Sequence, residues 1–126
     1  MGKEKGKTIL IVEDSPYLAE SLVDMLNISG YTAIVAPTGR EGVAMAIEQK
    51  PDLVLLDIRL PDIDGYEVYR RIRDDKWGAK ANIIVLTASE STDVISKNID
   101  LPADHVLFKP EWSVRDLLER IDQAVK

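Results

Sequence analysis

Polar residues of three kinds stand where short hydrophobic runs of this sequence end. They are three acids, a threonine and a lysine, namely Glu13, Asp14, Asp57, Thr87 and Lys109. Three carboxylates held close together favour a divalent cation such as Mg²⁺, which prefers oxygen ligands. A lysine and a hydroxyl beside that cation suit the oxygens of a phosphoryl group. The chemistry that these residue types indicate is therefore phosphoryl transfer, provided that the fold brings them together.

The hydrophobic runs themselves predict how these residues are brought together. They are rich in aliphatic and β-branched residues and lie at positions 8–12, 53–56, 83–86 and 106–108. Runs of this length and composition are typical of strands buried on both faces of a parallel sheet. Ligands of open α/β sheets bind outside the carboxyl ends of the strands. We therefore expect the five polar residues to converge on one edge of the sheet.

Helix signals fill the intervals between these runs. A Ser-Pro pair at residues 15–16 is a common helix start, apolar residues then keep helical spacing, and Gly30 ends the segment. Further helices are expected from Gly39, over residues 66–75, within residues 91–99 and over residues 113–125, with one more strand at residues 31–36. Five β-α units in this order predict right-handed crossovers and a doubly wound parallel α/β sheet with five helices.

Length and composition indicate one globular domain. The chain has 126 residues, of which 45% are hydrophobic and 30% charged, values that are ordinary for a soluble globular protein. We expect residues 1–7 to form a flexible tail and residues 8–126 a single domain. The lack of cysteine excludes disulfide chemistry and favours a cytoplasmic location. No apolar stretch approaches the ~20 residues of a membrane span, and a net charge of −6 argues against direct binding of nucleic acid.

Five short motifs give residues 8–125 a resemblance to the receiver domain of two-component response regulators. In chain order they are Glu13-Asp14, Asp57, Leu60-Pro61-x-x-Asp64-Gly65, Thr87-Ala88 and Lys109-Pro110. Each motif alone is also compatible with a helix cap, a strand residue or a surface charge, but their joint occurrence favours the resemblance. It implies a flavodoxin-like fold whose five-stranded sheet has the order 2-1-3-4-5. Asp62 and Asp64 are expected to form the turn after Asp57.

The resemblance and the chemistry of the side chains assign roles around the predicted metal. Asp57 is the expected nucleophile and phosphorylation site, because a carboxylate can form an acyl phosphate. Asp14 and Asp57 would bind Mg²⁺, with Glu13 acting directly or through water. By resemblance, the backbone carbonyl of Arg59 is a further metal ligand.

Two other residues would contact the phosphoryl group and report its presence. Lys109 would pair with the phosphoryl oxygens, and the Thr87 hydroxyl would donate a hydrogen bond to one of them. The family usually carries Tyr or Phe three residues before the lysine as a switch, whereas this chain has Val106 there. We therefore predict that phosphorylation changes the order of the helix within residues 91–99, whose residues are mostly poor helix formers.

The favoured function is a response regulator receiver that accepts a phosphoryl group from a phosphohistidine donor and then switches partner binding. It would not be an enzyme beyond its own phosphorylation and dephosphorylation. The donor would be a histidine kinase or a histidine phosphotransfer protein. A downstream protein would bind the face made by the fourth helix, the fifth strand and the fifth helix. Neither nucleic acid nor a membrane is expected as a direct partner.

Two alternatives remain open: a phosphorylation-independent interaction module with a receiver fold, and a receiver excised from a larger regulator or hybrid kinase. Two other classes fit the sequence less well. A haloacid dehalogenase-type phosphatase requires an aspartate two residues after its nucleophile, where this chain has Arg59. A flavodoxin-like FMN carrier needs hydroxyls and glycine in its first loop, and Glu13 and Asp14 would repel the FMN phosphate.

Overall fold

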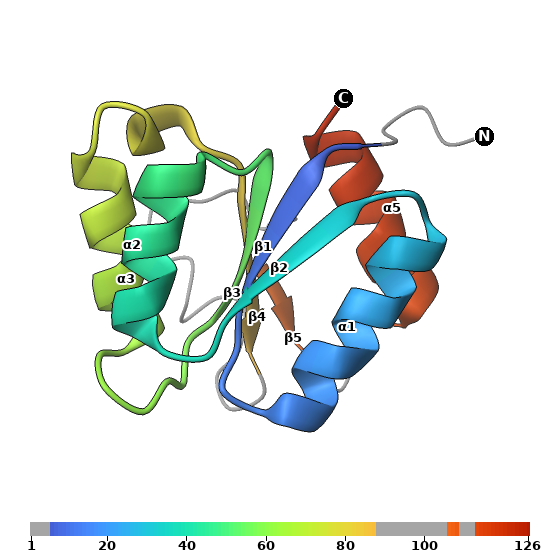
Figure 1. Ribbon diagram of the computed structural model, residues 1–126, viewed down its shortest axis with the longest axis horizontal. Helices are drawn as coiled ribbons and strands as arrows, with labels where there is room; N and C mark the ends of the chain where they lie inside the picture. Colours follow the sequence, from blue (N-terminus) through green and yellow to red (C-terminus); the bar gives the residue numbers. More distant parts are fainter. Residues whose placement is uncertain (1–5, 88–105, 109–112) are drawn as a thin grey trace.

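Strands and helices alternate along the part of the chain that the computed structural model describes, namely residues 6–87, 106–108 and 113–126 (Figure 1). The strands are β1 (Thr8–Val12), β2 (Thr32–Ala36), β3 (Leu53–Asp57), β4 (Ile83–Thr87) and β5 (Val106–Phe108). The described helices are α1 (Pro16–Ile28), α2 (Gly39–Gln49), α3 (Gly65–Asp74) and α5 (Val114–Ala124), with a short 3-10 helix, η1, at Gly78–Lys80. The helix expected within residues 91–99 lies outside the described residues.

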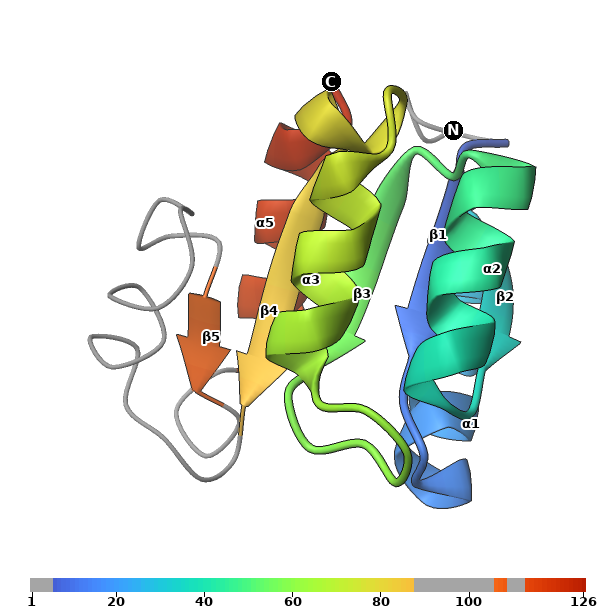
Figure 2. The same ribbon diagram turned by 90° about the vertical axis from the view of Figure 1, so that its left-hand side faces the viewer.

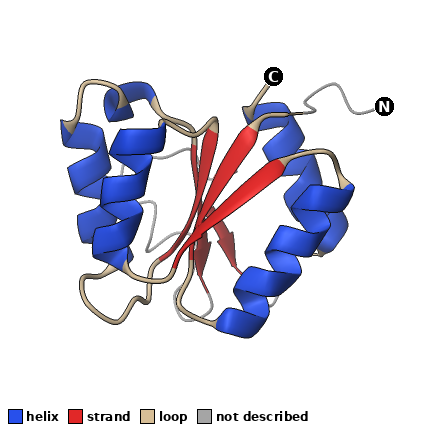
Figure 3. Ribbon diagram, viewed as in Figure 1, coloured by secondary structure: helices blue, strands red, loops and turns tan. Residues whose placement is uncertain are grey.

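The strands form one parallel sheet with the order β2-β1-β3-β4-β5. Helices α2 and α3 cover one face of the sheet, and α1 and α5 cover the other (Figures 1 and 2). Colouring by secondary structure separates the three layers, with the strands between two layers of helices (Figure 3). The predicted doubly wound parallel α/β architecture is confirmed, and the strand order is the one that the resemblance implied. Among the described helices, none is both long and apolar enough to cross a membrane.

Alternate residues of the central strands belong to two separate hydrophobic cores, because successive side chains of a strand point to opposite faces. One core, which includes residues of α2 and α3, contains the strand residues Leu10, Val12, Val54, Leu56, Ile83 and Val85. The other, which includes residues of α1 and α5, contains Ile9, Ile11, Leu53, Leu55, Ile84 and Leu86. Burying each such side chain stabilises the fold by about 1.5–3 kcal/mol relative to exposure. The strands that carry the predicted site are therefore fixed on both faces.

Polar side chains cap the described α-helices at their N-termini, where the first backbone N–H groups lack helical partners. The Ser15 hydroxyl accepts from the Leu18 N–H at 3.4 Å and starts α1. Thr38 accepts from the Glu41 N–H and starts α2. Asp64 and Ser113 start α3 and α5 in the same way, and Ser113 forms a reciprocal capping box with Asp116. Helices α1 and α2 thus begin within a few residues of the carboxyl ends of β1 and β2, whereas loop 58–64 separates α3 from β3.

Side-chain hydrogen bonds between distant segments complete the packing. The hydroxyl of Tyr31, the residue before β2, donates to the Asp122 carboxylate on α5. Arg73 near the end of α3 donates to the carbonyl oxygens of Gly78 at 2.8 Å and Ala81 at 2.7 Å, which holds η1 against that helix. Neither contact follows from the sequence patterns.

Candidate functional site

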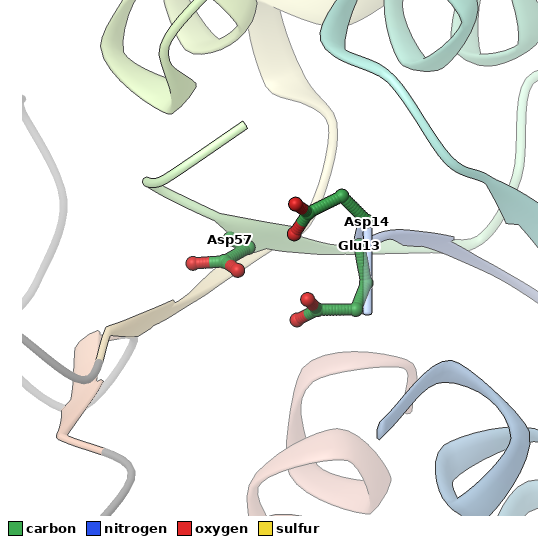
Figure 4. Close-up of side chains that lie close together, drawn as sticks. All are labelled: Glu13, Asp14 and Asp57. Atoms are coloured by element: carbon green, nitrogen blue, oxygen red, sulfur yellow. The ribbon is translucent and has the colours of Figure 1, made fainter. Parts of the chain in front are cut away.

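Three carboxylates meet at the carboxyl edge of the sheet (Figure 4). Glu13 and Asp14 follow the last residue of β1, and Asp57 is the last residue of β3. Val12 of β1 is in register with Leu56 of β3, so the acids that follow these two residues are neighbours. One ligand oxygen from each of the three residues lies within 4.8 Å of the others. The predicted convergence of the three acids is therefore a feature of the structure.

Two of these carboxylates are buried and are oriented by backbone N–H groups. Glu13 is 3% exposed and Asp57 is 7% exposed, whereas Asp14 is exposed to solvent. The Ser15 N–H donates to Glu13 Oε2 at 3.1 Å, and the Arg59 N–H donates to Asp57 Oδ1 at 3.2 Å. Burying carboxylate groups is costly unless they are hydrogen-bonded or bind a cation. Two buried carboxylates beside an exposed carboxylate suit a hard divalent cation that binds oxygen and keeps part of its water shell, as Mg²⁺ does.

A cleft of about 470 Å³ opens beside the acidic cluster. It is lined by Asp14 and by residues of the segment after β3: Ile58, Arg59, Leu60, Pro61, Asp64 and Tyr66. Asp14 therefore belongs both to the cluster and to the wall of an open cleft. The cleft leaves space for water molecules on a cation bound at the cluster. A small phosphorylated molecule could also reach the cluster through it.

The chain turns back on itself directly after Asp57, and Gly65 makes that turn possible. The Gly65 N–H donates to the Ile58 carbonyl at 2.7 Å. A Cβ at Gly65 would lie 2.5 Å from the Asp57 carbonyl oxygen and 2.6 Å from Ile58 Cα, closer than van der Waals contact allows. The Asp64-Gly65 pair of the sequence motif thus closes loop 58–64, and Asp64 also caps α3 by accepting from the Glu67 N–H at 2.9 Å.

Asp62 has a role that the sequence analysis missed, since it was expected only to form the turn. Its two carboxylate oxygens accept hydrogen bonds from the backbone N–H groups of Gly39 at 2.8 Å and Arg40 at 2.9 Å, in the first turn of α2. Burial raises the pKa of Asp62, but hydrogen bonds from the backbone N–H groups of Arg40, Ile63 and Gly39 outweigh it and lower the pKa to about 2. The partners lie 22 and 23 residues away, so no local signal identifies them.

We expect Asp62→Asn to lower the free energy of unfolding at neutral pH, because the native state stabilises the charged form of this carboxylate. The pKa of about 2 in the folded protein lies below the ordinary value of 3.8. The advantage of the wild type is therefore complete above the ordinary value and is lost as the pH falls towards 2. Urea unfolding of both proteins from neutral pH down to about pH 3 measures this. A difference in stability that stays constant with pH would contradict the prediction.

The structure describes the remaining predicted site residues only in part. Thr87 is the last residue of β4 and is in register with Phe108, the last residue of β5. Lys109 follows Phe108 in the sequence. The side chain of Thr87 and the whole of Lys109 lie outside the described residues, as does the side chain of Val106. Their roles in phosphoryl binding and switching remain predictions.

Known proteins are similar in sequence to this chain over nearly its whole length. A family model described as the response regulator receiver domain matches residues 9–122. The chain is 35% identical over 121 residues to the phosphate regulon transcriptional regulatory protein PhoB of Pseudomonas aeruginosa, which covers 96% of this chain and 52% of that protein. It is 37% identical over 113 residues to the response regulator MprA of Mycolicibacterium vanbaalenii, covering 90% of this chain and 48% of that protein. The chain thus spans about half the length of these curated relatives.

A solved structure of a receiver domain is similar to this chain in three dimensions. The receiver domain of the sensor histidine kinase PA1611 from Pseudomonas aeruginosa superposes with a TM-score of 0.84 and is 31% identical, covering 95% of this chain and 98% of that chain. That domain was crystallised with a magnesium ion coordinated in its active site cleft.

Proposed function

The chain belongs to the response regulator receiver family, and from this we propose that it accepts a phosphoryl group on Asp57 from a phosphohistidine donor. The observation that carries the proposal is the cluster of Glu13, Asp14 and Asp57, whose ligand oxygens lie within 4.8 Å of one another beside an open cleft. A helix cap or a solvated turn explains one acid at a strand end, but it does not explain two buried acids from neighbouring strands facing a third.

The acidic cluster fits Mg²⁺ as the resident cation. Glu13, Asp14 and Asp57 would hold it, together with the backbone carbonyl of Arg59. When bound, Mg²⁺ would neutralise the charge of the phosphoryl oxygens during transfer. The cleft beside Asp14 would leave room for the water molecules that this cation usually keeps.

The side chain of Asp57 is suited to the attack itself. It is almost fully buried, and the Arg59 N–H at 3.2 Å holds one oxygen, so the carboxylate is oriented before the donor arrives. One carboxylate oxygen would form a bond to phosphorus as the bond from phosphorus to the imidazole nitrogen of the donor breaks. The imidazole then leaves with the electron pair of that bond. Thr87 and Lys109 would bind the oxygens of the transferred group.

The experiment that tests this proposal uses a small phosphodonor in place of the kinase. Incubation with acetyl phosphate and Mg²⁺ should add the mass of one phosphoryl group to the intact chain, and the group should be labile. Chelating the metal should prevent the addition, because the buried acids would then repel the incoming phosphoryl oxygens. Equal labelling with and without chelator would contradict a role for the cation. No labelling at all would favour the alternative of a phosphorylation-independent interaction module.

For the output, we propose that the phosphorylated receiver binds a downstream protein through the helix within residues 91–99, strand β5 and helix α5. In this proposal residues 8–126 form a single receiver with five helices after a short tail, and the protein acts in the cytoplasm. Thr87 would transmit the signal without an aromatic partner, since Val106 occupies that position. Because the relatives are about twice as long as this chain, a receiver that belongs to a larger regulator or hybrid kinase is the second candidate.

A further inference from the structure

We propose that Asp62 is a positioning residue for the metal site, because it holds loop 58–64 against α2 and thereby sets the place of the Arg59 backbone carbonyl. The inference rests on the proposed function, since it takes this carbonyl to be a ligand of Mg²⁺. Asp62 itself lies three residues beyond Arg59 and is not among the acids of the cluster.

Hydrogen bonds hold loop 58–64 at two places, namely where its ends meet and at Asp62. At its ends, the Gly65 N–H donates to the Ile58 carbonyl at 2.7 Å. At Asp62, both carboxylate oxygens accept hydrogen bonds, one from the Gly39 N–H at 2.8 Å and one from the Arg40 N–H at 2.9 Å. The Arg40 side chain is 3.7 Å from the same carboxylate but is largely exposed, so this ion pair adds little. The two hydrogen bonds from backbone N–H groups therefore hold Asp62 against the start of α2.

The loop also packs closely against the start of α2 at the same place. A Cβ added to Gly39 would lie 2.6 Å from Ile63 Cγ1 and 2.9 Å from the Ile63 carbonyl oxygen. The loop backbone therefore touches the start of α2 where that helix has no side chain. The side chains of Ile63 and Leu60 also pack against the core between the sheet and helices α2 and α3.

Arg59 lies between Ile58, where the loop closes, and Asp62, and it is hydrogen-bonded to the nucleophile. Its N–H donates to Asp57 Oδ1 at 3.2 Å, and its carbonyl belongs to the next peptide group of the same loop. If the Asp62 side chain were lost, the loop would lose the two backbone hydrogen bonds that hold it to α2. The Arg59 carbonyl would then no longer be fixed with respect to Asp57 and Asp14. We expect the affinity for Mg²⁺ to fall, as it does when groups that orient metal ligands are removed.

Helix α2 provides a matched control, because it has a separate cap of its own. The Thr38 hydroxyl accepts from the Glu41 N–H at 3.1 Å, and Thr38 does not belong to the loop. Thr38→Ala and Asp62→Ala each remove a hydrogen-bond acceptor at the N-terminus of α2. Only Asp62→Ala releases loop 58–64. A difference between the two variants therefore separates positioning of the loop from stability of the helix.

The test is the dissociation constant for Mg²⁺ alone, measured by isothermal titration calorimetry at a temperature at which circular dichroism shows each variant to be folded. Both variants should melt at lower temperature than the wild type. Asp62→Ala should raise the Mg²⁺ dissociation constant about tenfold, whereas Thr38→Ala should leave it unchanged. Asp62→Asn, which keeps one oxygen acceptor and the same shape, should give an intermediate value, and it serves as the test if Asp62→Ala does not fold.

Three results would overturn the inference, and they differ in what they say of the proposed function. A wild-type dissociation constant in Asp62→Ala would show that the loop holds its place without Asp62, and the proposed function would stand. Equal weakening in Thr38→Ala would assign the effect to helix stability, and again the proposed function would stand. Failure of the wild type itself to bind Mg²⁺ would overturn both.

Discussion

Asp57→Asn should abolish phosphoryl labelling by acetyl phosphate while leaving the fold intact. The amide has nearly the same shape as the carboxylate and can still accept from the Arg59 N–H at the same position. It cannot form an acyl phosphate, because the amide lacks a carboxylate oxygen that can attack phosphorus. Intact mass spectrometry after incubation with acetyl phosphate and Mg²⁺ measures the loss.

The control for this prediction is Asp24→Asn, which removes an aspartate from the exposed face of α1. It should be labelled to the same extent as the wild type. Undiminished labelling of Asp57→Asn would show that another residue accepts the phosphoryl group and would overturn the assignment of the nucleophile.

Neutralising one acid of the cluster should raise the melting temperature in metal-free neutral buffer. Glu13, Asp14 and Asp57 place three negative charges within a few ångströms of one another, and like charges at that distance repel. Asp14→Asn and Asp57→Asn each remove part of this repulsion, with the larger effect expected at Asp57 because it is buried and therefore less screened. Thermal scans followed by circular dichroism measure the change.

Binding of Mg²⁺ to the cluster should reduce the same charge repulsion and stabilise the folded protein. At tenfold excess over its dissociation constant it should stabilise the wild type by about 1.4 kcal/mol. Asp14→Asn should lose most of this stabilisation, since it removes one ligand, whereas Asp24→Asn should keep it. Equal stabilisation of the wild type and Asp14→Asn by Mg²⁺ would show that the metal binds elsewhere.

The part of the site that the sequence predicts is the part fixed by strand ends. The apolar runs that end at Val12 and Leu56 are typical of buried strands, and the parallel register of these strands places Glu13 beside Asp57. Strand register alone does not give the orientation of the carboxylates, which depends on the Ser15 and Arg59 N–H groups.

Hydrogen bonds of side chains with residues distant in sequence are the part that could not be predicted. Asp64 acts locally, because it caps the helix that follows it, and a turn-forming aspartate before glycine already indicates this. Asp62 has the same residue type two positions earlier, yet its partners Gly39 and Arg40 belong to another helix. The Tyr31–Asp122 hydrogen bond spans 91 residues. Such pairs depend on the packed positions of whole elements, which single-sequence patterns do not encode.

The most direct test of the central claim is to locate the phosphoryl group on the chain. Borohydride reduction of the phosphorylated protein converts an aspartyl phosphate into homoserine, which survives digestion and peptide mass spectrometry. We predict homoserine at position 57 only, formed in the presence of Mg²⁺ and absent after chelation. Homoserine at another aspartate, or a phosphoryl group that borohydride does not remove, would contradict the assignment of Asp57 as the acceptor.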